Sequence, residues 1–366
     1  MSSFLKLLLL VLPVFWFFSS CEKEPEKPNG NDDIGFSGKG IYVLNEGLFH
    51  MNNSTLTWYD FESEQAVTDL FEIQNGRRLG DTGNDLKIYG SKMYIVVSGS
   101  SQVEVLDAAT GKSLKQIPFF DDGKPRQPRN VAFLNGKAFV CSFDGTVAVI
   151  DTTSLEIETF IPAGRNPDGI TTANNKIYVS NSGGLDFPDY DNTVSVIDFE
   201  SLKEIKRITV GSNPYTMDSD ENGFVYVISR GNYNDEKMRL QVIDSHTDEL
   251  VHTFTEFQAL NFTLGRKTAY VYHFDYFGGI GSSLLTIDLD TREILSENFI
   301  SDGTEIQTVY GIFADPLTEN IFVADAKGFT STGRIYCFDS EGRKKYSFPT
   351  GLNPGAMGVY YTQNGE

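Results

Sequence analysis

The sequence has few of the residues that build catalytic or metal sites. Its 366 residues include three cysteines and four histidines, and no two histidines have the spacing of a metal site. It contains no G-x-S-x-G nucleophile elbow, no P-loop and no dinucleotide-binding fingerprint. Cys141 and Cys337 lie far apart in apolar runs, which favours buried free thiols over a disulfide framework. We therefore expect no enzyme, with no catalytic residue, no metal and no cofactor.

Two acidic segments have some features of calcium sites. The segment "DSDENG" (218–223) matches the first half of an EF-hand loop, but position twelve is Ser229 and not the glutamate that calcium needs. We interpret it as a turn between two strands. The segment "DFPDYDN" clusters Asp186, Asp189 and Asp191 on a loop. It could hold calcium, but we interpret it as solvated charge.

Basic residues are in deficit, with a formal net charge of -20. A phosphate backbone would be repelled by this charge, so we expect no nucleic-acid partner.

The N-terminus has the pattern of a targeting signal. A continuous apolar run from Leu7 to Phe18 is too short for an ordinary membrane-spanning helix and fits the apolar region of a secretory signal. Ser19 and Ser20 then precede Cys21. This resembles a bacterial lipoprotein signal, in which the cysteine becomes the lipidated first residue; the alternative is an ordinary signal peptide with an incidental cysteine. Phe18 and Ser20 depart from the commonest lipobox and match the looser form of Bacteroidetes.

The residues that follow are polar and rich in Pro, Gly, Glu and Lys, so they cannot bury a core. We expect a signal peptide at 1–20, a flexible tether at 21–38, a folded domain at 39–361 and a tail at 362–366. The charged start of the tether, "EKEPEK", resembles the signal that sends Bacteroidetes lipoproteins to the outside of the outer membrane. The expected location is therefore the outer membrane, held by lipid alone and facing the cell exterior.

The rest of the chain repeats one pattern seven times. An apolar strand such as "KIYVSNSGG" is followed by a strand that ends in aspartate, such as "VSVIDFES". The marker aspartates recur every 44 to 51 residues, and they are Asp60, Asp107, Asp151, Asp198, Asp244, Asp288 and Asp339. A period of about 45 residues with several strands per unit is typical of propeller blades.

The sequence predicts an all-β, seven-bladed β-propeller of four-stranded antiparallel blades. Each marker aspartate should open a turn by accepting hydrogen bonds from nearby backbone N–H groups. The first copy, "GIYVLNEG", lacks an inner strand, whereas the chain ends with an unmatched inner strand in "GLNPGAMGVYY". The C-terminal strand should therefore pair with the first blade and close the ring.

The quoted repeats resemble the YncE or YVTN-type seven-bladed propellers over residues 40 to 361. Together with the lipoprotein signal, the acidic tether and the "GIYVLNEG" opening, they resemble the BtuG-type surface lipoproteins of Bacteroidetes. That resemblance implies capture of cobalamin (vitamin B12) and its transfer to a TonB-dependent outer-membrane transporter. No binding motif of that family can be matched residue by residue.

Candidate ligand residues come from two sets of loops on one face of the predicted propeller. Counting back from each second strand gives a ring of equivalent positions at the mouth of the central channel: Asn84, Arg129, Asp168, Tyr215, Leu260, Tyr310 and Gly355. The long loops after the second strands carry aromatic side chains, namely Phe49, His50, Phe187, Tyr190, Tyr233, Phe274, Tyr276, Phe277 and Phe329. The two sets either bind a polar ligand with flat faces, or fill the channel and pack their own loops.

We expect a binding protein that captures cobalamin. A surface propeller that binds a glycan or a protein in another uptake system is the alternative, and a lyase or lactonase in the channel is less expected because Asp168 alone does not supply a catalytic set.

Overall fold

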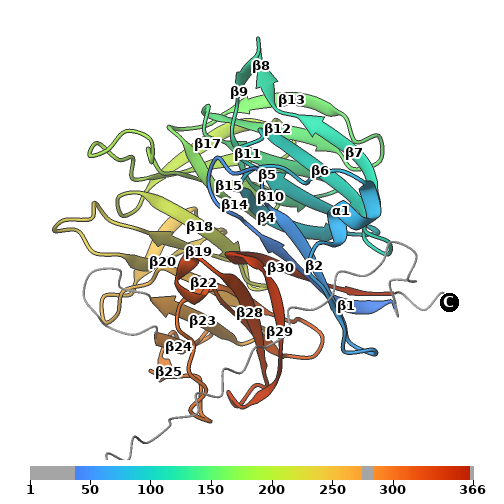
Figure 1. Ribbon diagram of the computed structural model, residues 1–366. Helices are drawn as coiled ribbons and strands as arrows, with labels where there is room; N and C mark the ends of the chain where they lie inside the picture. The colour runs from blue at the N-terminus through green and yellow to red at the C-terminus, as the bar shows by residue number, and fades with distance from the viewer. Residues whose placement is uncertain (1–37, 274–282, 363–366) are drawn as a thin grey trace, which may run out of the picture. The chain divides into compact units, whose positions relative to one another are not determined.

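The computed structural model describes residues 38–273 and 283–362 of the chain. All of these residues belong to one compact unit, Gly35–Glu366. Within the described residues the strands form seven four-stranded sheets and one two-stranded hairpin, so the predicted all-β, seven-bladed propeller is confirmed (Figure 1). The predicted signal peptide, Cys21 and all but the last residue of the tether lie outside the described residues, as do Phe274, Tyr276 and Phe277.

Blades 2 to 4 are built from strands of six or seven residues. Blade 2 consists of β4 (Gly83–Tyr89), β5 (Lys92–Val97), β6 (Gln102–Asp107) and β7 (Ser113–Pro118). Blade 3 consists of β10 (Pro128–Leu134), β11 (Lys137–Ser142), β12 (Thr146–Asp151) and β13 (Ile157–Pro162). Blade 4 consists of β14 (Pro167–Ala173), β15 (Lys176–Asn181), β16 (Thr193–Asp198) and β17 (Lys203–Thr209).

Blades 5 to 7 repeat the same order of inner to outer strand. Blade 5 consists of β18 (Pro214–Ser219), β19 (Phe224–Ser229), β20 (Arg239–Asp244) and β21 (Glu249–Thr253). Blade 6 consists of β22 (Asn261–Leu264), β23 (Thr268–His273), β24 (Ser283–Asp288) and β25 (Ile294–Ser296). Blade 7 consists of β26 (Val309–Ala314), β27 (Ile321–Asp325), β28 (Thr332–Phe338) and β29 (Lys344–Leu352), with a short 3-10 helix, η1 (Lys327–Phe329), after β27.

Blade 1 joins the two ends of the propeller. It consists of β1 (Lys39–Asn45), β2 (Thr55–Asp60), β3 (Ala66–Val67) and, as its inner strand, the C-terminal β30 (Pro354–Tyr361). Strand β30 pairs antiparallel with β1, with Lys39 opposite Tyr361 and Ile41 opposite Val359. The predicted closure of the ring is therefore confirmed, and no other sheet in the described part of the chain combines strands from both of its ends.

Two elements were not predicted. Blade 1 has an outer strand of only two residues, and the chain then forms α1 (Leu70–Asn75), which buries Leu70 and Phe71. The Asp69 side chain accepts a hydrogen bond from the backbone N of Glu72 and so caps the helix. A hairpin of β8 (Phe120–Asp121) and β9 (Lys124–Pro125) projects between blades 2 and 3 (Figure 1).

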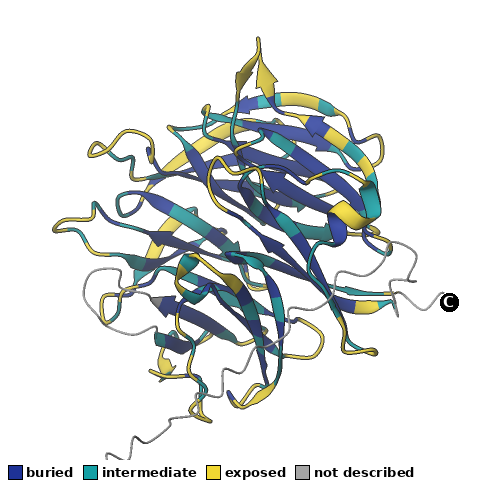
Figure 2. Ribbon diagram, in the orientation of Figure 1, coloured by how far each residue is buried: buried dark blue, intermediate teal, exposed yellow. Residues whose placement is uncertain are grey.

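The core lies between neighbouring blades. One cluster joins Tyr94 and Val105 of blade 2 to Val131, Val140 and Ile150 of blade 3. Second and third strands are buried on both faces, whereas the outer strand β17 exposes all its residues except Ile208 (Figure 2). The second strands are apolar along almost their whole length in the sequence because each is packed between two neighbouring blades.

The marker aspartates open turns as predicted. Asp198, for example, accepts hydrogen bonds from the backbone N and the Oγ of Ser201, at 2.8 and 2.7 Å. These bonds hold the pKa of the Asp198 carboxyl below its usual value. Equivalent backbone bonds are made by the other six markers.

Cys141 and Cys337 are buried and unbridged, as predicted. Burial raises the pKa of the Cys337 thiol to about 11, so the thiol is protonated at neutral pH. None of the helices in residues 38–273 and 283–362 has the length and apolar character needed to cross a membrane.

Candidate functional site

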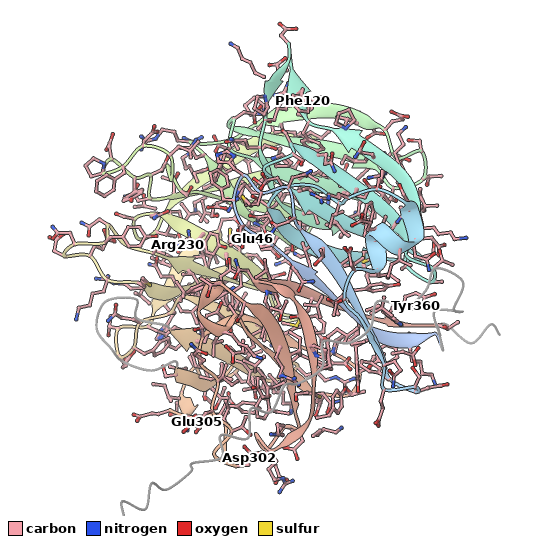
Figure 3. The ribbon with its side chains drawn as sticks, viewed as in Figure 1. Glu46, Phe120, Arg230, Asp302, Glu305 and Tyr360 are labelled. Atoms are coloured by element: carbon pink, nitrogen blue, oxygen red, sulfur yellow. The ribbon has the colours of Figure 1, made fainter. Side chains whose placement is uncertain are left out.

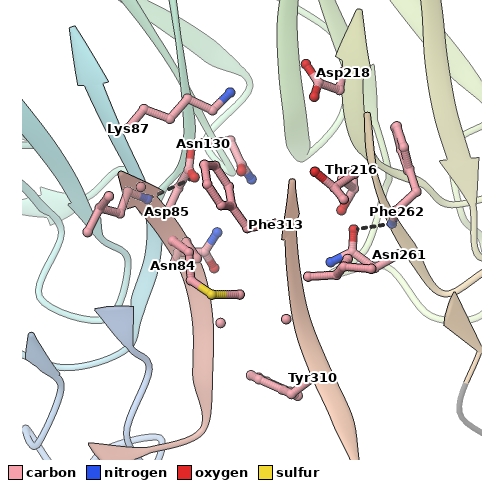
Figure 4. Close-up of a pocket in the computed structure, with 18 of the residues that line it drawn as sticks. Asn84, Asp85, Lys87, Asn130, Thr216, Asp218, Asn261, Phe262, Tyr310 and Phe313 are labelled. Atoms are coloured by element: carbon pink, nitrogen blue, oxygen red, sulfur yellow. Dashed lines mark hydrogen bonds between the residues drawn. The ribbon is translucent and has the colours of Figure 1, made fainter. Parts of the chain in front are cut away.

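The inner strands surround a central cavity of about 720 Å³. Its lining comes mainly from the inner strands of six blades, β4, β10, β18, β22, β26 and β30. Tyr272 of β23 and the loop residues Glu46, Arg230, Leu260 and Pro316 complete it. Figure 4 shows the side chains that project from these strands toward the cavity, with Phe313 between them. A cavity of this size lies within the range of small-molecule sites, roughly 300–1,000 Å³.

Six of the seven predicted ring positions line this cavity: Asn84, Arg129, Tyr215, Leu260, Tyr310 and Gly355. Asp168 is not part of the lining. It is almost completely buried and lies against Arg129, which belongs to the preceding blade. Counting back from the second strands therefore located residues at the mouth of the cavity. Contacts with neighbouring side chains decide which of these residues line it.

Arg129 is held on several sides. Its Nε donates to Asp168 Oδ1 at 2.8 Å, and its guanidinium lies 4.5 Å above the centre of the Phe143 ring. The Asn84 amide donates to the Arg129 carbonyl at 2.6 Å and so links blades 2 and 3. Burial opposes the charge, but the Asp168 carboxylate outweighs it and keeps the pKa of Arg129 above its usual value.

The predicted ring positions, which we call the first ring, lie on segments that are joined by hydrogen bonds to a second ring of residues. It is made by the residue that follows the second strand of each blade, and its described members are Glu46, Ser98, Phe143, Ser182, Arg230 and Ala326. The backbone N–H of each donates to a carbonyl two residues before a first-ring position: those of Asn353, Thr82, Gln127, Asn166, Asn213 and Thr308. Because this bond recurs in six blades, the two rings keep the same alignment around the mouth.

The bends before the inner strands fix this geometry. Asn166, Asn213 and Asn353 have φ values of 45°, 55° and 54°. Asparagine tolerates this left-handed conformation better than most residues, which accounts for the repeated Asn-Pro bend of the sequence.

Arg230 of the second ring differs from Arg129 because no side chain of the described residues accepts a hydrogen bond from it. Its guanidinium lies 3.4 Å above the centre of the Tyr215 ring, and its Nε is buried without a hydrogen-bond partner. It forms no ion pair with a carboxylate of residues 38–273 or 283–362. Burial lowers the pKa of Arg230, but Tyr215 and Asp168 outweigh it and raise the pKa above its usual value, so the side chain is cationic.

Glu46 and Tyr310 connect blade 1 to blade 7 at the same level. The Tyr310 hydroxyl donates to Glu46 Oε2, and the Tyr272 hydroxyl donates to the Tyr310 carbonyl. Burial raises the pKa of Glu46, while the Tyr310 bond and the charges of Arg129 and Arg230 act in the opposite direction. Figure 3 shows that Glu46 and Arg230 lie on the same side of the propeller, away from Tyr360.

A second group of charges lies deeper in the cavity, where Figure 4 places Asp85, Lys87 and Asp218. Asp85 accepts bonds from the backbone N of Leu86 and of Val131, at 2.9 and 3.0 Å. Asp218 accepts one from the backbone N of Ser219 at 2.9 Å. Burial raises the pKa of both carboxyls, and Lys87 partly opposes it.

Aromatic side chains stand above the mouth on the loops of blades 4 and 5. Phe187 and Tyr233 are 72% and 58% exposed. Tyr190 lies between them, with its ring centre 6.0 Å from each, in edge-to-face contacts. Phe49 on the blade 1 loop is 70% exposed and packs 3.8 Å from His50. These contacts hold one continuous aromatic surface, Phe187–Tyr190–Tyr233, which we call the aromatic rim.

The two acidic segments have ordinary partners. Asp220 of "DSDENG" accepts bonds from the backbone N of Asn222 and of Phe224, at 3.0 and 2.8 Å, so the predicted turn is confirmed. Asp186 and Asp189 pair with Arg165 at 3.1 and 3.6 Å. No group of three metal-ligating side chains was found in the part of the chain that the structure describes.

Sequence reasoning missed Glu46 and Arg230. The signal was present, because each is the first residue after an apolar second strand. Counting forward from those strands, as the first ring was counted backward, gives both positions.

The fold and the site define a seven-bladed β-propeller whose channel opens through a mouth of arginine, tyrosine and glutamate side chains under an aromatic rim. The chain belongs to the family described as domain of unknown function DUF5074, whose model matches residues 39–360.

Two solved structures have the same fold at low sequence identity. A quinonprotein alcohol dehydrogenase-like protein of Bacteroides thetaiotaomicron is 16% identical, with a TM-score of 0.63, over 90% of this chain and 79% of its own. Hydrazine synthase of Kuenenia stuttgartiensis is also 16% identical, with a TM-score of 0.60, over 75% of this chain and 88% of its own. These similarities show the fold alone.

One curated relative matches part of the chain. Antigen Lp49 of Leptospira interrogans, serogroup Icterohaemorrhagiae, is 27% identical over 168 residues, which is 41% of this chain. The match spans 35% of the antigen's own length, about a third of that protein.

Proposed function

We propose that this protein binds cobalamin at the mouth of the propeller and delivers it to a TonB-dependent outer-membrane transporter. The aromatic rim above the cavity is the observation that carries the proposal. Exposed, mutually braced rings bury area on a flat ligand at little entropic cost, because they are already fixed in place. Cobalamin offers the flat faces of a corrin ring and a fringe of amides.

The size of the cavity supports this arrangement. A ligand as large as cobalamin would lie across the rim and insert only part of itself into a cavity of about 720 Å³. Asn84, Tyr215 and Tyr310 at the mouth supply amide and phenol groups that can bond the ligand's amides.

The location is part of the proposal. Lipidation at Cys21 would hold the protein on the outer surface of the outer membrane, where it meets ligand before the transporter does. The protein would act as a binding module and would leave the ligand chemically unchanged.

A glycan is the second candidate. Phe187 and Tyr233 present exposed ring faces, which also suit the apolar faces of sugars. A surface propeller of another uptake system would use the same rim.

Calorimetry on the folded domain tests the proposal. Cyanocobalamin should bind with a measurable heat at micromolar protein, whereas a panel of neutral oligosaccharides should give none. Heat from an oligosaccharide and none from cyanocobalamin would replace the first candidate with the second.

A further inference from the structure

Arg230 combines three features that set it apart in the described part of the chain. It lines the cavity, its Nε is buried without an acceptor, and it forms no ion pair with a carboxylate of the described residues. A buried donor without an acceptor destabilises the folded protein, and the cost is larger for a charged group.

Three other arginines show how Arg230 differs from the rest. Arg129, on the first ring of the mouth, is paired with Asp168 at 2.8 Å. Arg126 also has a buried Nε without a partner, but its terminal nitrogens bind Asp121 and Asp144. Arg292 stacks on Phe224 at 4.7 Å, yet it follows the Asp288 turn and is not part of the cavity lining.

The carboxylates that face Arg230 already have partners. Asp168 accepts from Arg129, and Glu46 accepts from Tyr310. Both interact with the arginines through space, but neither forms an ion pair with Arg230. The stacking on Tyr215 fixes the plane of the guanidinium, so its donors have a set direction before any ligand arrives.

We propose that Arg230 binds an oxyanion, a phosphate or a carboxylate, carried by the ligand that occupies the mouth. A guanidinium presents its donors as a planar fork that matches the paired oxygens of these two groups. The protein as a whole carries a net charge of -20, so general attraction does not bring an anion here. Recognition at this position therefore depends on the local fork.

This inference rests on the proposed function for the identity of the ligand, because cobalamin carries a single phosphodiester. A glycan with uronic acid groups would supply a carboxylate to the same fork. The two sources differ in the oxyanion, and the experiment distinguishes them.

The experiment compares the wild type with Arg230→Gln, Arg230→Lys and the control Arg292→Gln, each as the folded domain. Arg292 is matched to Arg230 because it also stacks on an aromatic ring with a buried, unpartnered Nε, but lies outside the cavity. Circular dichroism and thermal melting first check that each variant folds. Removing an unpaired buried charge should not lower the melting temperature.

The ligand arm uses cyanocobalamin and cyanocobinamide, which lacks the phosphodiester and its nucleotide. Arg230→Gln should weaken the binding of cyanocobalamin by about ten- to a hundredfold, the range expected for hydrogen bonds to a charged group. It should change cyanocobinamide binding by less than about threefold. Arg230→Lys should fall between, because it keeps the charge and loses the fork, and Arg292→Gln should match the wild type.

The anion arm uses inorganic phosphate and glucuronate, read by thermal stabilisation. At least one should stabilise the wild type more than Arg230→Gln; phosphate indicates the phosphodiester source and glucuronate the acidic glycan. If cyanocobalamin binds both proteins equally and neither anion distinguishes them, the inference is overturned while the proposed function stands. If cyanocobalamin does not bind the wild type but an anion binds through Arg230, the cobalamin proposal is overturned and the oxyanion site stands. If no probe binds the wild type, both are overturned.

Discussion

Arg129 donates a hydrogen bond from Nε to Oδ1 of Asp168 over 2.8 Å, and this ion pair joins the inner strands of blades 3 and 4 at the mouth. Both side chains are largely buried, at 15% and 4% exposure. The pair is therefore a structural link between blades beside a guanidinium, that of Arg230, which has no such link.

Breaking this pair should destabilise the propeller. Arg129→Met leaves the buried Asp168 without its partner, and we expect a loss of about 3–5 kcal/mol in the free energy of unfolding. The double variant Arg129→Met/Asp168→Leu should recover most of the loss, because no charge is then left buried. Urea unfolding measures all three proteins.

The matched control is the exposed pair of Arg207 and Glu204 on β17. Arg207→Met should change the free energy of unfolding by no more than about 0.5 kcal/mol. An Arg129→Met loss as small as that of the control would contradict the structural role of the buried pair.

Asp218 should make stability fall as pH rises. Burial raises its pKa in the folded protein above the unfolded value, so its contribution to stability is full below the unfolded pKa and is lost as pH rises through the folded pKa. Asp218→Asn should therefore melt above the wild type at pH 7. The difference should shrink as the pH is lowered toward 4, measured by calorimetry across a pH series.

Asp198 is the opposite case and serves as the control. Hydrogen bonds from Ser201 lower its pKa in the folded protein, so its contribution is present above the unfolded pKa and is lost as pH falls through the folded pKa. Asp198→Ala should melt below the wild type at pH 7, with a difference that shrinks in strong acid. The same sign for both variants at pH 7 would show that one pKa direction is wrong.

The closing strand should be indispensable. Deleting residues 353–366 removes β30 and exposes one edge of β1, which otherwise pairs from Lys39 to Asn45. It also removes Met357 from the core between blades 1 and 7. We expect a lower, broader thermal transition, or association through the free edge, seen by calorimetry and light scattering.

The control removes only residues 363–366, which lie beyond β30. That variant should melt as the wild type does. A monomer lacking 353–366 that melts at the wild-type temperature would show that pairing of β30 contributes nothing to stability.

The aromatic rim should contribute to ligand affinity. Tyr233→Ala and Phe187→Ala should each weaken cyanocobalamin binding by about 1–3 kcal/mol, on the order of five- to over a hundredfold in Kd. Tyr190→Ala should act partly through its neighbours, because its ring touches both. Asp198→Ala, in a turn on the opposite face, should leave the affinity of the folded fraction unchanged. Weaker binding by Asp198→Ala alone would place the ligand on that opposite face.

Lipidation should depend on Cys21. Cys21→Ser should give a folded protein that takes up no labelled palmitate, because the first strand begins only at Lys39. The wild type should be labelled and should partition into detergent. Equal labelling of the two proteins would exclude Cys21 as the modified residue.

Most of the fold could be predicted because each blade repeats the same local sequence features. Alternation along the strands and an aspartate that opens a turn recur from unit to unit, and three of the seven units share an Asn-Pro bend, so one copy supports another. Helix α1 had no such support: the segment from Leu70 to Asn75 occurs once, and it replaces most of an outer strand that the repeat would have placed there.

The candidate site was predictable in position but not in pairing. Counting from the second strands located Arg129, Tyr215 and Tyr310 at the mouth. That Asp168 turns to Arg129, and that Arg230 meets no acceptor, depends on side chains of adjacent blades some 40 residues away in sequence. A single chain pattern carries no information about such contacts between repeats.

The pairing of β1 with β30 also determines where a label can be attached without blocking the mouth. Strand β1 runs from Lys39, beside Tyr361, to Asn45, next to Glu46 at the mouth. Seven strand residues span about 20 Å, so the two ends of the ring leave together on the face remote from Arg230, where Thr362 also bonds to Gly38. A tag, a bead or a fluorophore attached at either end of the propeller would thus leave the mouth unobstructed. The ring could likewise be joined through these neighbouring ends and reopened at the exposed β8–β9 hairpin, giving a circularly permuted protein with the same seven blades.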